Sequence, residues 1–570
     1  MTRWMVTFVL VALAAHPAAA GDIPPFDPSA PGAATLHGKL RLSIADAIKM
    51  GLENNLDVEV SRHDPPIAWE EYRAAWGVYD PELFAEGGYE SRETPVASSL
   101  QANSTLVERE TAGQSGLRGK VPWLNSTYSL TYIGNSLETN SSISELSPSY
   151  NVRLAAQAVF PLMRNLIWDA DWTRVKQTKV TYGSSLEEFR RQVMDVVQRI
   201  ESGYWDLVAT DEQVRVAETS VEAARALLRQ TKTQYEVGVV SRVEVTQAEA
   251  GVAEREVALI RDRNVYRTAQ DNLLDLVLGR GLRPGSQLEI EPTDRPDDYI
   301  IYDIDVEEAA TKAFENRPEL ASAKHSIERQ QLEVKYRNNQ RLPQLDVVGT
   351  YSVQGLSGKP NADAADFGSG NRGTLAAVNA GVIAPVNGVF SAIGAPTLAP
   401  LPVPPAPGPP LVDRSYSSAD DDWFSGGAQD WGVQGIFSIP LGNRMARHRA
   451  TQAQIQLRRA KTELARLQQG IILSVRRAAR DLHSAQEGIE AAERARVAAE
   501  EQLRAEQIRL EQGESTPFDV LLRERDLVES ESQLIGAIRV YRNSIVSLDR
   551  EQGTILKSKN IVVDDVRAFR

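Results

Sequence analysis

The chain contains no cysteine among its 570 residues. This absence excludes disulfide bonds, cysteine-bound zinc, thiol nucleophiles and a lipid-modified N-terminal cysteine. Basic residues are outnumbered, because 63 Lys and Arg face 77 Asp and Glu and leave a net charge of −14 at pH 7. A nucleic-acid-binding protein usually carries an excess of basic residues, so we expect no nucleic-acid partner. Any attachment to a membrane has to come from the fold.

Long apolar runs are also scarce. The one clear run, Val6 to Ala15, follows Arg3 and precedes the small residues Ala18 to Ala20. This pattern is typical of a secretory signal, so we assign residues 1–20 to a cleaved signal peptide. A retained membrane helix is disfavoured because the run has about half of the roughly 20 residues that span a bilayer. No later segment is continuously apolar over that length, and we expect no transmembrane helix in the exported chain.

Motifs of catalysis and metal binding are missing as well. The six histidines include no pair at a helical metal-binding spacing, and neither a GK[ST] phosphate loop nor a GxSxG elbow occurs. Residues 368–373 match GxGxxG formally, but no strand pattern precedes them, so we interpret them as a loop. We therefore predict that the chain is not an enzyme and that it uses no cofactor and no bound metal.

Proline is absent from three long stretches, which are residues 162–283, 441–516 and 518–570. In the first stretch, apolar and small residues recur at alternating spacings of three and four, which is the heptad pattern of coiled-coil packing. These residues are Leu186, Phe189, Val193, Val196, Ile200, Gly203, Leu207, Thr210, Val214, Ala217, Val221, Ala224, Leu228, Thr231 and Tyr235. The pattern predicts a helix of roughly 100 Å at 1.5 Å per residue.

Gly238 and Gly513 follow the ends of these long stretches. Glycine adopts the left-handed conformation that commonly closes a helix, so we expect each long helix to end there and a second helix to return. The result is two antiparallel coiled-coil hairpins, at residues 165–279 and 443–556.

The stretches before the long helices alternate with period two. Apolar residues alternate with mainly polar or small ones over residues 152–160, 345–353 and 431–439, which predicts β-strands. A soluble sandwich gives the same alternation, but segments of about ten residues also match transmembrane barrel strands. We therefore place barrel strands within 80–161 and 343–440. A few strands per chain cannot close a barrel, so closure requires several chains.

Two parts of these strand regions are irregular. Residues 356–430 are rich in Gly, Ala, Ser and Pro, and we interpret them as an exposed extracellular loop without a packed core. Gly116 to Gly134 contains further alternation, which is compatible with an additional hairpin. The number of strands therefore stays open.

An internal repeat relates the two halves of the chain. The tripeptide Val-Tyr-Arg of residues 265–267 recurs at 540–542, and the same shift of 275 superposes the two turn glycines. Residues 21–300 and 301–570 each read as short helix, strands and long helical hairpin. The predicted fold is mainly α with transmembrane β, in which the strands join a β-barrel shared between several chains and the hairpins pack as antiparallel coiled coils.

Several motifs in this order resemble the TolC-like outer-membrane efflux protein family. They are Leu42–Ile48, Glu53–Asn55, the strand ends Phe160–Leu162 and Ile439–Leu441, and the turns Tyr235-x-x-Gly238 and Leu510-x-x-Gly513. The resemblance implies a homotrimer in the outer membrane, in contact with its lipid, whose strands form a shared trimeric β-barrel and whose hairpins form a periplasmic tunnel. Such a trimer serves as a passive exit duct in efflux or type I secretion. It also implies a periplasmic adaptor, docked at tips carrying Gly238 and Gly513, and an inner-membrane pump.

Asp519 matches the position of an acidic residue that narrows the closed tip in several family members. Three copies around an axis would make a carboxylate ring that attracts cations. Glu244 is the equivalent candidate in the first hairpin. The alternative for both is a helix N-terminal acid stabilised by the helix dipole. Leu522 takes the place of a second acidic residue, so the resemblance does not extend to a double ring.

A second class of function stays open from the sequence alone. The chain could be a periplasmic coiled-coil structural or adaptor protein whose strands form a soluble domain. Strand patterns beside both long helices, and two equivalent hairpins rather than one, favour the channel.

Overall fold

The structure is a computed structural model that describes residues 37–97, 101, 103–281, 287–295, 304–361, 364, 369–403, 419 and 428–563. The expected signal peptide, residues 1–20, lies outside these ranges. The chain divides into two compact units. Unit 1 comprises Met1–Pro66, Ser185–Ser322 and Leu464–Arg570, and unit 2 comprises Ile67–Ser184 and Ala323–Glu463.

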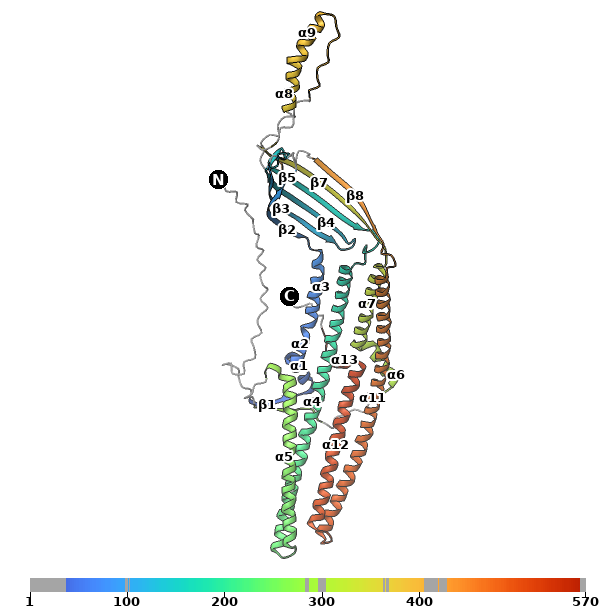
Figure 1. Cartoon of the computed structure of the whole chain (residues 1–570). Helices are drawn as coiled ribbons and strands as arrows, with labels where there is room; N and C mark the ends of the chain where they lie inside the picture. The colour runs from blue at the N-terminus through green and yellow to red at the C-terminus, as the bar shows by residue number, and fades with distance from the viewer. Residues whose placement is uncertain are drawn as a thin grey trace. The chain divides into compact units, whose positions relative to one another are not determined.

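Two very long helices dominate the chain (Figure 1). Helix α4 covers Ala170–Glu236 with 67 residues and α11 covers Arg444–Glu511 with 68, so each is about 100 Å long at 1.5 Å per residue. Helix α5, Arg242–Leu278, follows α4, and α12, Pro517–Gln552, follows α11. The long proline-free stretches are thus helical, and most of the heptad residues of α4 are buried.

Short elements complete unit 1. They are β1 (His37–Leu42), α1 (Ile44–Asn54), α2 (Leu56–Arg62), η2 (Gly279–Gly281), β6 (Gln287–Pro292), α6 (Val306–Asn316) and α13 (Ile555–Ser558). Helix α1 begins after Ser43, whose side chain accepts a hydrogen bond from the Asp46 backbone amide. Strands β1 and β6 pair in parallel, which the sequence reasoning missed. Helices α3 (Asp64–Trp76) and α7 (Pro318–Asn339) extend across the boundary between the units.

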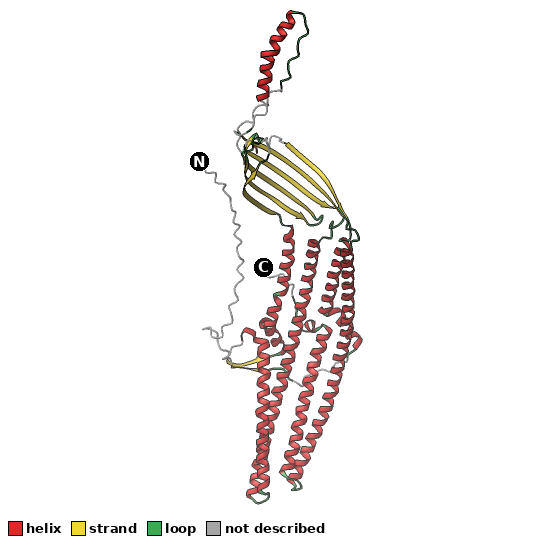
Figure 2. Ribbon diagram, in the orientation of Figure 1, coloured by secondary structure: helices red, strands yellow, loops and turns green. Residues whose placement is uncertain are grey.

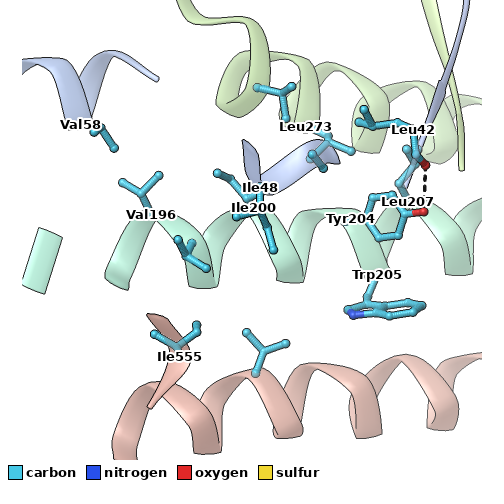
Figure 3. Packing of buried hydrophobic residues seen from close by; sticks show 14 of the residues in the cluster. Leu42, Ile48, Val58, Val196, Ile200, Tyr204, Trp205, Leu207, Leu273 and Ile555 are labelled. Carbon is cyan, nitrogen blue, oxygen red and sulfur yellow. Dashed lines mark hydrogen bonds between the residues drawn. The ribbon is translucent and has the colours of Figure 1, made fainter. Parts of the chain in front are cut away.

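The main core of unit 1 surrounds the middle of α4 (Figure 3). Val196, Ile200 and Leu207 are fully buried there and pack with side chains from α1 and α5. Tyr204 is also fully buried, and its hydroxyl donates to the Leu42 backbone carbonyl at 3.0 Å. This bond satisfies a polar group that burial would otherwise leave unpaired, and it ties α4 to the end of β1.

Unit 2 contains one six-stranded antiparallel sheet, drawn in yellow in Figure 2. Its strands, in spatial order, are β2 (Glu82–Pro95), β3 (Thr105–Val121), β4 (Ser126–Thr139), β5 (Leu146–Pro161), β7 (Gln344–Pro360) and β8 (Ala428–Ser438). The alternation around Gly116 to Gly134 does form a hairpin, β3–β4. The short η1 helix, Gly77–Tyr79, leads into β2.

The segment expected to be a loop at 356–430 contains regular structure, so that interpretation was wrong in part. Strand β7 continues to Pro360, and residues 369–392 form α8 (Ser369–Val378), the π-helix η3 (Asn379–Ile383) and α9 (Ala384–Ala392). Composition averaged over the insertion concealed a stretch rich in Ala and Val beside the prolines. Residues 404–418 and 420–427 lie outside the described ranges.

Thr374–Ala392 is also long and apolar enough to cross a membrane by length and composition. From the sequence we expected no transmembrane helix, because Asn, Gly and Ser residues interrupt the apolar run in this segment. Such a helix is weak evidence of a span on its own, and its residues are not buried in the chain.

Candidate functional site

The two faces of the sheet differ in polarity. Strand register aligns one apolar row across all six strands. This row consists of Leu83, Leu117, Leu130, Ala156, Tyr351 and Trp431. Leu83 is 82% exposed and Trp431 is 75% exposed. An unbroken apolar row with five of its six side chains exposed is unusual for a sheet in water and is typical of a sheet that faces lipid.

The adjacent row of the other face is polar or small. It consists of Glu82, Arg118, Ser129, Gln157, Thr350 and Gly432. Arg118 Nε donates to Glu82 Oε2 at 2.8 Å, and two rows further on the same face Gln114 donates to Glu86 at 2.7 Å. Apolar and polar rows thus alternate with the pleat, as in strands with one lipid face and one aqueous face.

Two strand edges of this sheet lack a neighbour within the described part of the chain. Strand β2 pairs with β3 alone, and β8 pairs with β7 alone. Every pairing is antiparallel and the strands number six, so β2 and β8 run in opposite directions. The β8 edge of one chain could therefore continue antiparallel into the β2 edge of another copy.

The turns at the free ends of the hairpins have nearly the same geometry. Gly238 has φ +80° and Gly513 has φ +77°, the left-handed region that favours glycine. In the first turn Gly238 N donates to Tyr235 O at 2.9 Å and Val239 N to Gln234 O at 2.8 Å. The second turn repeats both bonds, which together form the Schellman closure of a helix. The sequence prediction of both turns is confirmed.

Asp519 and Glu244 both occupy the N3 position of the returning helix. The Thr516 hydroxyl donates to Asp519 Oδ2 at 2.7 Å, and the Asp519 amide donates to Thr516 Oγ1 at 3.3 Å. The Ser241 amide donates to Glu244 Oε2 at 3.1 Å. The hydrogen bond from the Thr516 hydroxyl lowers the pKa of Asp519 below its usual range. Both acids therefore have the helix-capping role that the sequence left as the alternative.

The two hairpins pack against each other close to these caps. Leu521 lies in a cluster with Ala224, Leu227 and Val520. It also packs against Gly251 of α5, where an added Cβ would approach Leu521 Cδ1 to 3.1 Å. Arg255 Nη2 donates to the Leu521 carbonyl at 3.2 Å. These contacts fix the start of α12, and with it Asp519, against the first hairpin. Sequence reasoning missed them because the partners are more than 200 residues apart.

Acidic and histidine side chains do not gather into a metal site in the described ranges, where no group of three or more could hold a metal ion.

Comparison with known proteins decides the family. The model of the outer membrane efflux protein family matches residues 118–279 and 412–554, which is more than half of the chain. The chain belongs to this family. It is accordingly an outer-membrane efflux protein, with its helical part in the periplasm. A search of curated proteins found no match.

Solved structures show the same fold for the outer-membrane efflux protein. A membrane protein from Pseudomonas aeruginosa has 15% sequence identity and a TM-score of 0.59, with 90% of each chain covered. The CmeC outer membrane channel of Campylobacter jejuni has 13% identity and a TM-score of 0.58, covering 92% of this chain and 90% of that one. The outer membrane protein VceC of Vibrio cholerae has 13% identity and a TM-score of 0.56, covering 90% and 96%.

Proposed function

We propose that three copies of this chain form a passive, water-filled exit duct through the outer membrane. The observation that carries the proposal is the apolar row from Leu83 to Trp431 beside the polar row from Glu82 to Gly432. Such a sheet has one face for lipid and one for water. Family membership in the efflux class supports the same conclusion.

Barrel closure would join β8 of one copy to β2 of the next. Open strand edges are not tolerated in lipid, so each edge needs a partner. A head-to-tail contact repeated about a three-fold axis closes into a ring. Six strands from each of three copies give eighteen strands, and barrels of about this size enclose an aqueous channel.

The paired hairpins would form the periplasmic conduit, and the turns at Gly238 and Gly513 would meet a periplasmic adaptor. An inner-membrane pump would supply energy and choose the cargo, in efflux or in type I secretion. The repeated order of helix, strands and hairpin in residues 21–300 and 301–570 supports a duplication that gives each chain two equivalent hairpins.

The resting gate would lie at the tips, with Asp519 as its principal acid and Glu244 as a weaker contributor. The lowered pKa of Asp519 keeps its carboxylate charged, and three copies would surround the axis. The alternative function is a periplasmic adaptor or structural protein. Its sheet would lie in water, where an apolar row across six strands would not be expected.

Cross-linking between strand edges tests the closed trimer. The cysteine-free chain allows cysteines to be placed at Tyr89 in β2 and Val433 in β8, followed by a flexible bis-maleimide in native membranes. We expect bands of two and three linked chains on a denaturing gel. Cysteines at Leu130 and Ala156, register partners in central strands of one chain, are the control and should add no such bands. If the edge variant gave no bands of linked chains, the closed trimeric barrel would be contradicted.

A further inference from the structure

The helical parts of unit 2 carry charge opposite to that of the whole chain. Residues 163–184, 323–343 and 441–463 contain fifteen Lys and Arg but only five Asp and Glu, in a chain of net charge −14. These segments adjoin the end of the sheet at which strands β3 and β5 finish and strand β7 begins. The excess of positive charge is therefore concentrated at this end of the strands.

Part of this charge lines a cavity of about 540 Å³ between α4, α7 and α11. Its charged walls are Arg329, Glu333 and Arg337 on α7 and Arg449 on α11. Arg337 Nε donates to Glu333 Oε1 at 2.7 Å, and Gln177 donates to Glu333 Oε2 at 3.2 Å. The single acid of the cavity is thus already neutralised. Neither Arg329 nor Arg449 pairs with an acid among the described residues.

A second cavity of about 430 Å³ continues the first, since both are lined by Arg337 and Arg449. It adds Arg164 and Arg444 to the basic wall. From Arg329 to Gln340 the two cavities follow α7 for about 16 Å at 1.5 Å per residue. We call this pair of cavities the basic groove.

Exposed apolar side chains lie at the sheet end of the basic groove. Leu441 is 98% exposed and Met445 is 69% exposed, and both line the second cavity. At the same end of the strands, Trp123 in the β3–β4 turn is 68% exposed. Exposed aromatic and apolar residues at strand ends are typical of the interface between lipid tails and headgroups.

From this combination we infer that the basic groove binds the phosphate group of an anionic phospholipid from the periplasmic leaflet. Arginine donates paired hydrogen bonds to phosphate oxygens, and Arg444 and Arg449 are exposed and unpaired with acids of the described chain. Leu441 and Met445 would contact the first methylenes of the acyl chains. The inference rests on the proposed function, because it needs the sheet to lie in the membrane.

Lipid titration of the detergent-solubilised full chain tests the inference. Binding of phosphatidylglycerol and of phosphatidylcholine is measured by native mass spectrometry, at low salt and at roughly 0.5 M salt. We expect phosphatidylglycerol to bind at least about tenfold more tightly, with the preference reduced by salt. The double variant R444Q/R449Q should lose the preference.

The matched control is R174Q/R458Q, which removes the same charge from exposed arginines of α4 and α11 outside the basic groove. It should keep the preference, and equal loss in both variants would overturn the site. Equal binding of the two lipids by the unaltered chain would also overturn it. Inorganic pyrophosphate is titrated in parallel. If it binds with the same dependence on Arg444 and Arg449 while the lipids do not differ, the groove takes a soluble anion and the lipid assignment is wrong.

Failure here is distinguishable from failure of the proposed function. A cross-linked trimer without a lipid preference removes only the lipid site, whereas a chain that is absent from the membrane fraction removes both.

Discussion

Asp519 joins two roles that the sequence presented as alternatives. Its carboxylate caps α12 through Thr516, and the same bonds hold it in one place at the tip of the hairpin. A charge fixed by a cap is suited to a gate, because three copies would repeat the same position about an axis. The capping role was readable from Thr516-Pro517, whereas the contact of the neighbouring Leu521 with Gly251 was not.

Substitution of Asp519 by Asn and by Ala separates the two roles. Asn keeps a hydrogen-bond acceptor for the cap but loses the charge, and Ala loses both. We expect both variants to raise conductance or lower cation selectivity in a planar bilayer, and only Ala to weaken the start of α12. Glu244→Gln, at the equivalent cap, should change selectivity less. Unchanged conductance and selectivity in both Asp519 variants would remove the gate role and leave the channel intact.

Glu319 is the acid of a dense ion network in unit 1. It accepts hydrogen bonds from Arg317 and forms an ion pair with Arg550 at 3.0 Å. Burial opposes its ionisation, but the hydrogen bond and charge of Arg317 and the charge of Arg550 outweigh burial and lower the pKa of Glu319 to about 2. The sequence could not reveal this network, because Arg317 lies between α6 and α7, Glu319 on α7 and Arg550 on α12, far along the chain.

Glu319→Gln should lower the free energy of unfolding by about 1–3 kcal/mol at pH 7, because charged hydrogen bonds of a largely buried group are lost. A lowered folded-state pKa stabilises the fold above the ordinary value near 4.5, and this stabilisation disappears as the pH falls toward 2. In denaturant titrations, the free energy of unfolding of the variant should therefore differ strongly from that of the unaltered chain at pH 7 and only slightly at pH 2.5. Glu307→Gln, an exposed acid of α6, is the control. A difference independent of pH would contradict the ionic origin.

The helix of residues 369–392 and the segment that follows it form a hairpin held by two asparagines. Asn387 exchanges two hydrogen bonds with the backbone of Leu398, at 2.6 and 2.8 Å, and Asn379 does the same with Leu401, at 2.7 and 2.8 Å. Two turns of α-helix take 7.2 residues, and the π-helix η3 absorbs the extra residue, so that both side chains lie on one side. Composition alone does not reveal such pairing.

The double variant N379A/N387A should release the returning segment 395–403 from the helix. We expect faster amide hydrogen exchange at Leu398 and Leu401, whose amides lose their acceptors, by about one order of magnitude or more. Ser391→Ala, elsewhere on α9, should leave the exchange unchanged. Protection that survives the double variant would mean that other contacts hold the hairpin.

The whole chain shows which structural information is local. Heptads, period-two strands and glycine turns were predictable because each depends on residues close in sequence. The number of strands, their register and the β1–β6 pair were not, since they depend on partners far along the chain. The apolar row is the clearest case: each strand supplies one of its side chains, and only the register from Leu83 to Trp431 makes them continuous.

The mass of the mature protein extracted from the outer membrane tests the trimeric duct most directly. Membranes are fractionated, the protein is extracted in mild detergent, and light scattering corrected for detergent gives the protein mass. We predict outer-membrane fractions and a mass three times that of one chain, because the β2 and β8 edges need partners. A soluble periplasmic monomer or dimer would contradict the shared barrel and favour the coiled-coil adaptor.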